Sequence, residues 1–269
     1  MKYLNLLVLL VCFNFIKSHT DSFIQMCLED LIRNALPMKA TDNTCQLAVQ
    51  HGEAHNGKWQ MEIRFKPFPE SIKADTTDVI YLGGNTEAAD SINLKEMLPN
   101  LKSMHIIEPV PIFFQELKKN MAKYLSWAHL YPIGLGNSNR NISISPNDLK
   151  GQGTFVMNTT GGDIILNILT PRDFFGQINF TGTLPLPVLH VNCEGCEYEV
   201  FETLIQEKML DRFSVINISF HYMAGIDKLF TRYCKIREHF LASYIMDQQS
   251  IAFGWERWLR KHNQTSSRR

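Results

Sequence analysis

The sequence predicts an α/β fold in which helices cover both faces of a mostly parallel sheet. From residue 78 onward, short apolar runs alternate with helix-like stretches, and each run stops abruptly at Gly, Asn or an acidic residue. Buried parallel strands have this appearance, because both of their faces lie inside the protein. Regular alternation of strands and helices favours a doubly wound, Rossmann-like sheet with right-handed crossovers.

The expected elements follow one another in a regular order. Strands are predicted at 79–82, 105–107, 129–133, 187–191 and 214–220, and helices at 86–98, 111–123, 197–207 and 228–241. Residues 138–186 are rich in Asn, Gly and Thr, so we expect hairpins or loops there around an apolar stretch at 164–169. A last apolar segment covers residues 251–259.

Residues 21–75 break this pattern, and we expect them to form a small N-terminal extension with helical and β parts. Residues 21–36 carry apolar side chains at helical spacing, and residues 59–65 alternate polar and apolar side chains like an edge strand. No linker argues for a second large domain. The prediction is therefore one α/β domain at 76–262 with a short tail at 263–269.

The first 20 residues are typical of a secretory signal peptide. Lys2 precedes an almost wholly apolar run at 4–16, which Lys17 ends. This run is too short to span a bilayer, but it suits the apolar core of a signal peptide. An uncleaved signal anchor is the alternative, because the small-residue cleavage pattern is poor. We expect a secreted protein, or one in the lumen of the endoplasmic reticulum or Golgi, with no further membrane span.

Charge and sequons agree with this location. The chain has 27 basic and 27 acidic residues, and loss of Lys2 and Lys17 with the signal would leave 25 basic ones. This balance lacks the basic surface of a nucleic-acid-binding protein. A glycoprotein is expected, because five triplets fit the N-glycosylation pattern, at Asn141, Asn158, Asn179, Asn217 and Asn263. Asn217 lies in an apolar run, so it should be buried and unmodified.

The cysteines leave several pairings open. Cys27 and Cys45 could form a local bridge. Cys193 and Cys196 have the Cys-x-x-Cys spacing of a thiol oxidoreductase, whose reactive pair lies where a strand meets a helix. A disulfide to Cys234, or a role for small side chains in a crowded turn, is the simpler alternative. No second pair of Cys or His completes a zinc site, so no metal is expected.

Two strand ends indicate a nucleotide-like cofactor. Gly83-Gly84-Asn85 would let the backbone turn tightly and approach a ligand, and the next helix would offer free N–H groups to a carboxylate or phosphate. Glu108 follows 25 residues after Gly83, where a carboxylate can accept hydrogen bonds from a ribose diol. A plain turn and a solvated loop acid are the respective alternatives.

A third strand end carries the densest group of polar side chains. Asn192 and Glu194 are expected at the carboxyl edge of the sheet, where ligands bind. Glu197 could instead stabilise the first turn of the next helix. His221 ends another strand, where it could act as a general base or be satisfied in the core. His190 lies inside a strand and is expected to be structural. Gly-x-Ser-x-Gly, His-Glu-x-x-His and Walker A patterns are absent from the sequence.

Four of these segments together resemble the FkbM-type methyltransferases, a family of class I S-adenosylmethionine-dependent enzymes. They are Tyr81–Asn85, Ile107–Pro111, Gly134–Asn137 and Val191–Val200. The NCEGCE run at 192–197 and the GWERW run at 254–258 are similar to an animal branch of this family. The resemblance covers roughly residues 76–258. It implies a class I methyltransferase fold and S-adenosylmethionine-dependent methylation of an oxygen on an unknown acceptor, either a small molecule or a glycan.

The resemblance also implies roles for particular residues. The cofactor-binding residues would be Gly83, Gly84 and Asn85 at the methionine end, Glu108 at the ribose, Gly136 and Asn137 near adenine, and Asn192 beside the methyl-transfer site. Glu194 and His221 would be the catalytic base candidates. Metal ligands are not implied.

The sequence departs from the family pattern at three positions, and two of them, Glu87 and Asn192, favour a second hypothesis. Tyr81 stands where Asp is frequent, Glu87 where Gly is usual, and Asn192 where Asp is usual. Asn cannot accept a proton as a general base does. The alternative function is therefore a secreted binding protein that keeps the methyltransferase fold but has lost turnover, and a thiol oxidoreductase is the third candidate.

Overall fold

The computed structural model describes residues 64–146, 149, 162–180, 187–221, 226–249 and 254–261. The chain divides into two compact units, Met1–His55 and Asn56–Arg269, and all described residues belong to the second. The predicted signal segment, the helix at 21–36, the Cys27–Cys45 bridge and two sequons, Asn158 and Asn263, lie outside the described residues. No helix in the described part is long and apolar enough to cross a membrane.

A seven-stranded sheet forms the centre of the second unit, with the order β3-β2-β1-β7-β8-β10-β9. The strands are β1 Asp78–Leu82, β2 Ser103–Ile107, β3 Ala128–Tyr131, β7 Val188–Val191, β8 Val215–Ser219, β9 Tyr244–Gln249 and β10 Trp255–Arg260. All neighbours are parallel except β10, which is antiparallel to both β8 and β9. This sheet confirms the predicted doubly wound, mostly parallel Rossmann-like fold.

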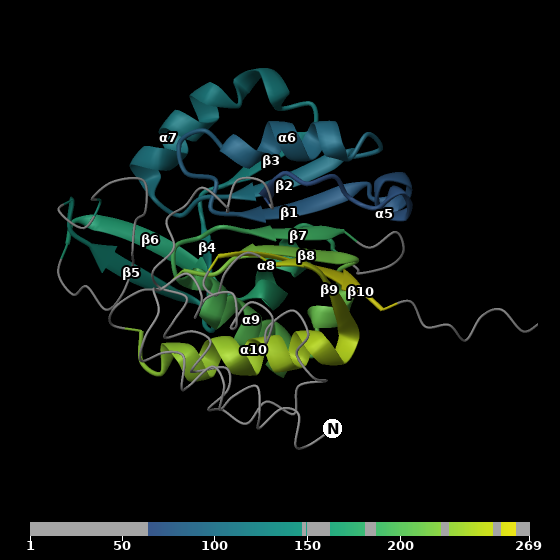
Figure 1. Ribbon diagram of the computed structural model, residues 1–269. Helices are drawn as coiled ribbons and strands as arrows, with labels where there is room; N and C mark the ends of the chain where they lie inside the picture. Colours follow the sequence, from purple (N-terminus) through teal and green to yellow (C-terminus); the bar gives the residue numbers. More distant parts are fainter. Residues whose placement is uncertain are drawn as a thin grey trace, which may run out of the picture. The chain divides into compact units, whose positions relative to one another are not determined.

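Helices cover both faces of the sheet (Figure 1). They are α5 Glu70–Asp75, α6 Ala89–Met97, α7 Pro111–Asn120, α8 Pro171–Gln177, α9 Cys196–Gln206 and α10 Leu229–Ser243, with short 3-10 turns at Ala122–Tyr124 and Leu210–Arg212. Figure 1 shows α6 and α7 on one side and α9 and α10 on the other. The strand order reverses between β1 and β7, and ligands bind at such switch points in open α/β sheets.

Side-chain alternation along the strands explains how the layers pack. Val79, Tyr81 and Ile106 point from β1 and β2 to one face, where they join Leu94 of α6 and Leu117 of α7 in a buried apolar cluster. On the other side, Phe240 of α10 contacts Phe201 of α9 and Trp258 of β10. Burial of large apolar side chains on both faces is the main favourable contribution to this fold.

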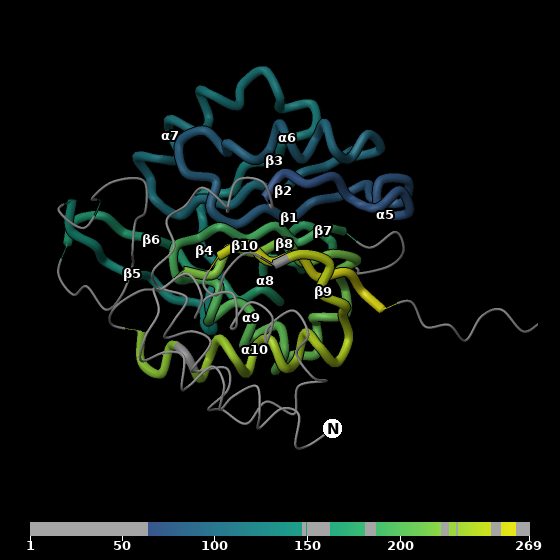
Figure 2. Tube along the Cα trace, viewed as in Figure 1, coloured from purple at the N-terminus to yellow at the C-terminus, as the bar shows by residue number. Residues whose placement is uncertain are grey.

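A second sheet with the order β4-β6-β5 follows directly after β3. Its strands are β4 Gly134–Leu135, β5 Arg140–Ile144 and β6 Ile164–Leu169. The sequence predicts hairpins or loops here, and β5 and β6 do pair antiparallel, whereas β4 joins β6 in parallel. Figure 2 shows these strands beyond one end of the main sheet, at the side where α7 begins.

Helix α6 begins at Ala89, later than the predicted start at residue 86. The loop before it takes left-handed backbone conformations at Asn85 (φ 49°) and Ala88 (φ 43°), which a helix cannot contain. Helix α8 is not predicted from the sequence, although its signal is present. Thr170 accepts a hydrogen bond from the Asp173 N–H, and Pro171 occupies the first helical position.

The GWERW run forms strand β10 and is buried almost completely. Glu256 accepts hydrogen bonds from the Tyr233 hydroxyl (2.6 Å) and from the Trp258 ring N–H (2.9 Å). Arg257 donates to the Lys66 carbonyl (2.7 Å) and stacks on Phe68, 4.2 Å from the ring centre. A buried charge is tolerated only with such partners, so this motif has a structural role. Strand β9 beside it is absent from the predicted elements.

Candidate functional site

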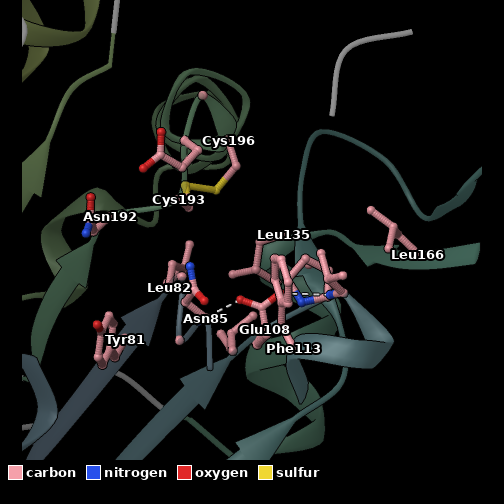
Figure 3. A pocket seen from close by; sticks show the side chains of 18 of the residues that line it. Tyr81, Leu82, Asn85, Glu108, Phe113, Leu135, Leu166, Asn192, Cys193 and Cys196 are labelled. Atoms are coloured by element: carbon pink, nitrogen blue, oxygen red, sulfur yellow. Dashed lines mark hydrogen bonds between the residues drawn. A yellow bond between two sulfur atoms is a disulfide. The ribbon is translucent and has the colours of Figure 1, made fainter. Parts of the chain in front are cut away.

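A cavity of about 400 Å³ opens at the carboxyl ends of β1, β2 and β7. Figure 3 shows side chains from these strand ends and from the second sheet around it. Of the predicted cofactor and catalytic residues, six line the cavity: Gly83, Gly84, Asn85, Glu108, Asn192 and Glu194. Segments more than 100 residues apart in sequence therefore meet at the switch point of the sheet.

Gly83 is required by its backbone and by its neighbours. Its φ of 90° is unfavourable for other residues, and an added Cβ would lie 1.8 Å from the Asn192 carbonyl oxygen. The Asn192 N–H in turn donates to the Leu82 carbonyl (3.0 Å). The loops after β1 and β7 are therefore packed directly on each other, and glycine permits that contact.

Most N–H groups of the turn itself are bonded within the protein. The Gly83 and Gly84 N–H groups both donate to the Ile107 carbonyl (3.0 Å each), and the Ala88 N–H donates to Gly84 (2.7 Å). The Thr86 N–H donates to the Asn85 side-chain oxygen (2.6 Å). These bonds fix the loop, so an anionic group in the cavity needs another donor.

Glu108 lies at the middle of the cavity and is only 5% exposed. One carboxylate oxygen accepts the Asn85 N–H (2.7 Å), as Figure 3 shows, and the other accepts the Val110 N–H (2.8 Å). Burial raises the pKa of Glu108 to about 7, although these two donors oppose the rise. Each oxygen keeps a second acceptor position, so the carboxylate can still bind a pair of hydroxyl groups.

The cavity is apolar on one side of Glu108 and polar on the other. Helix α7 and the second sheet line one side with the apolar side chains of Phe113, Leu135, Ile142, Leu166 and Ile168, and with Arg140. The other side contains Tyr81 and Asn192, and the lining also includes Glu194 and Arg64, whose charge acts on Tyr81. In Figure 3, Leu135, Phe113 and Leu166 lie on one side of Glu108 and Tyr81 and Asn192 on the other.

His221 lies behind the cavity wall, between two carboxylates. Its Nδ1 is 3.2 Å from Glu197 and its Nε2 is 3.4 Å from Glu194. Burial disfavours the charged ring, but Glu197 and Glu194 outweigh this and raise the pKa of His221 above its ordinary value of 6.5. A raised pKa widens the pH range over which the ring is protonated and cannot accept a proton, so this arrangement favours Glu194 over His221 as a base.

Glu197 is completely buried and joins two loops. It accepts hydrogen bonds from the Gly195 N–H (2.8 Å) and the His221 N–H (2.7 Å). The carboxylate therefore fixes the start of α9 to the loop after β8, in keeping with a structural role at the helix start.

Replacement of Glu197 by Gln should lower the free energy of unfolding by about 2–4 kcal/mol, because the single amide oxygen cannot accept both N–H groups and because the His221 ring loses the nearer of its two carboxylates. The His221 contribution is fully present below pH 6.5 and is lost as the pH rises through its raised folded pKa. Urea unfolding should therefore show that the difference in the free energy of unfolding between wild type and variant becomes smaller from pH 6 to pH 9. Glu202→Gln, at a partly exposed pair with Arg232, should cost less than about 1 kcal/mol. Equal losses in both variants would contradict this role.

Gly136 and Asn137 do not line the cavity. Their strand end contacts Glu199, which accepts the Asn137 N–H (3.3 Å) and pairs with Arg140 (2.6 Å). It is Arg140 and Glu199 that reach the cavity from this region. The sequence does not predict Arg140, Glu199 or Arg64 as cavity residues, because no recognisable motif assigns them a role.

Cys193 and Cys196 form a disulfide with each other, so the alternative pairing with Cys234 is wrong. Both line the cavity, and the ring that they close contains Glu194 and Gly195, which have left-handed φ values of 52° and 103°. The disulfide thus fixes the turn that carries Glu194. In the part of the chain that the structure describes, no group of three acidic, His or Cys side chains could hold a metal ion.

His190 and Asn217 are structural, as their positions in strands predict. The His190 Nε2 lies 2.9 Å from Asp90, and its Nδ1 faces the Asn217 amide at 3.1 Å. Both residues are buried, so the Asn217 sequon is closed to modification. Asn141 and Asn179 are exposed.

Solved structures similar to this chain are methyltransferases of low sequence identity. The methyltransferase FkbM from Methylobacillus flagellatus has a TM-score of 0.44 and 12% identity over 86% of this chain. The chain spans 60% of that protein's length. The O-methyltransferase TomG from Streptomyces achromogenes, solved with S-adenosylmethionine, has a TM-score of 0.43 and 11% identity over 86% of this chain and 94% of its own. No protein-family model matches the chain, and no curated protein matches its sequence.

Proposed function

We propose that this protein binds S-adenosylmethionine and transfers its methyl group to an oxygen of a small-molecule or glycan acceptor. The observation that carries the proposal is the position of Glu108, a buried acid between an apolar and a polar end of one cavity. The groups of S-adenosylmethionine follow one another in the same order as the lining of the cavity: an apolar purine, a ribose diol and a charged amino acid. The donor set therefore fits this cofactor, with adenine at the second sheet, ribose at Glu108 and the methionine portion at Asn192.

When bound, the cofactor supplies an electrophilic methyl group on a sulfonium. The protein's part is mostly to hold the two reactants in line and to exclude water. Asn192 and Glu194 border the polar end, where an acceptor hydroxyl would approach. Glu194 would take the hydroxyl proton, and the disulfide-closed turn holds its backbone in place. His221 would stabilise this carboxylate from behind.

Titration calorimetry with S-adenosylmethionine and S-adenosylhomocysteine tests the cofactor assignment. Both should bind with micromolar affinity. NAD is the control, because it shares the ribose and adenine but replaces the amino acid by a second nucleotide, and it should bind at least tenfold more weakly. If neither S-adenosylmethionine nor S-adenosylhomocysteine binds, the proposed function is wrong.

Binding of the cofactor should strengthen as the pH rises through about 7. The ribose hydroxyls donate to the ionised Glu108 carboxylate, and the pKa of this group is about 7 before binding. Affinity for S-adenosylhomocysteine should therefore increase up to about tenfold between pH 6 and 8. The pH dependence should be flat in Glu108→Gln. A wild-type affinity that is constant over this range would contradict the ribose assignment.

A non-catalytic binding protein is the second candidate, and it is favoured by Asn192 at the strand end where the family has Asp. Such a protein would bind S-adenosylmethionine without turnover. A broad screen of hydroxyl acceptors separates the two functions, since any acceptor-dependent formation of S-adenosylhomocysteine establishes an enzyme. An insulin-reduction assay addresses the thiol oxidoreductase hypothesis, which predicts activity that is lost in Cys193→Ser.

The place of action remains a proposal from the sequence. We propose that the protein works in the secretory pathway or outside the cell, as a glycoprotein and without nucleic-acid partners. Exposed Asn141 and Asn179 are the described sequons that a glycosyltransferase could reach.

A further inference from the structure

Most N–H groups of the glycine turn are already bonded within the protein, so the cofactor's α-carboxylate would gain from a charged partner elsewhere in the cavity. This inference rests on the proposed function. In the turn, the N–H groups of Gly83, Gly84, Thr86 and Ala88 are all bonded within the protein, and the Asn85 N–H is used by Glu108. The Asp90 backbone at the start of α6 is hydrogen-bonded to the Tyr81 hydroxyl. Breaking these bonds would cost about as much as a new bond to the ligand returns.

Three arginines line the cavity among the described residues: Arg64, Arg140 and Arg232. Arg140 pairs with Glu199 and Arg232 with Glu202, whereas Arg64 is the arginine whose charge acts on Tyr81 at the other end of the cavity. The Arg64 side chain is 19% exposed, so the guanidinium is largely shielded from water but still accessible to a ligand. It stacks on Trp255, with the guanidinium carbon 5.1 Å from the ring centre. An arginine held in this way loses little conformational entropy when it binds a carboxylate, because its planar group is already oriented.

The partners of Arg64 hold it from one side. One terminal nitrogen pairs with Asp90, a fully buried acid that is also bonded to His190. The Arg64 Nε, by contrast, is buried and has no hydrogen-bond partner among the described residues. A guanidinium has five N–H donors in a fork, so the pair with Asp90 leaves donors for a second carboxylate.

We propose that Arg64 binds the α-carboxylate of S-adenosylmethionine and makes the site selective for cofactors that carry this group. Asp90 is its positioning residue, since it orients the guanidinium without reaching the cavity. The pair of Arg64 and Asp90 thus adds a charged partner for the anionic group, which the sequence prediction gives to the N–H groups of the helix after the glycine turn.

The test compares S-adenosylmethionine with decarboxylated S-adenosylmethionine, which keeps the sulfonium, the amino group and the nucleoside. Calorimetry on the wild type should show about 30-fold tighter binding of the carboxylated ligand, which corresponds to about 2 kcal/mol. In Arg64→Met, this preference should disappear, while affinity for the decarboxylated ligand stays within about twofold. Arg172→Met is the control, because Arg172 also pairs with an acid, Glu207, but lies outside the cavity. It should change neither affinity.

Each outcome has a separate meaning. Equal weakening of both ligands in Arg64→Met would overturn the proposal and show that Arg64 only supports the fold. Binding of neither ligand by the wild type would overturn the proposed function itself. If Arg64→Met fails to fold because Asp90 is left unpaired, Arg64→Met with Asp90→Asn removes both charges. That double variant should show the same loss of preference, and a retained preference would refute the assignment.

Discussion

Replacing Gly83 by alanine should lower the free energy of unfolding by roughly 3 kcal/mol or more. The left-handed backbone alone costs an L-residue about 1–2 kcal/mol. In addition, the new Cβ would fall 1.8 Å from the Asn192 carbonyl, so the loops after β1 and β7 must separate. Urea unfolding of the purified variant measures the loss. Cofactor affinity should fall as well, because both loops line the cavity.

Gly176→Ala is the matched control for this prediction. Gly176 lies in helix α8, and an added Cβ there would meet nothing within 4 Å. Alanine is favoured over glycine in a helix by about 0.5–1 kcal/mol, so this variant should be as stable as the wild type or slightly more stable. Similar losses in the two glycine variants would show that close packing of the two loops is not the cause.

Replacing Glu108 by alanine should weaken binding of S-adenosylmethionine about 100-fold. Two hydrogen bonds from ribose hydroxyls to a charged acceptor are removed, each of which contributes about 1.5–3 kcal/mol. The lower end of their combined loss, about 3 kcal/mol, corresponds to a factor of about 100 in the dissociation constant. Calorimetric titration at pH 8, where the wild-type carboxylate is ionised, measures the effect.

Glu116→Ala controls for the general loss of an acid. Glu116 lies on helix α7, is 51% exposed and pairs with Lys119 on the surface. Its replacement should leave the dissociation constant unchanged within twofold. An affinity of Glu108→Ala equal to that of the wild type would exclude Glu108 as the ribose-binding residue.

Much of the fold could be predicted because parallel strands have strong local signals. Apolar runs such as Val79–Leu82 and Val188–Val191 are buried on both faces and end at polar residues. The same ends meet at the switch point, which is why Glu108 and Asn192 could be placed in one site from the sequence. Strand β9 is not predicted from the sequence, because Tyr244–Gln249 lacks a regular alternation of polar and apolar side chains.

The remaining parts of the site depend on contacts that no local pattern encodes. Arg64 reaches the cavity only because Asp90 on α6 fixes it there. The glycine turn is typical of an anion site, yet the N–H groups of Gly83 and Gly84 donate to the Ile107 carbonyl of the neighbouring strand. His221 could be placed at a strand end, but its raised pKa comes from Glu197 and Glu194 on the loop and helix after β7.

A crystal structure of the complex with S-adenosylhomocysteine tests the central claim most directly. It should show adenine against Phe113 and Leu166, both ribose hydroxyls within hydrogen-bonding distance of Glu108, and the α-carboxylate at Arg64. A ligand that lies in the reverse direction, or that binds away from Glu108, would contradict the assignment of this cavity to the methyl donor.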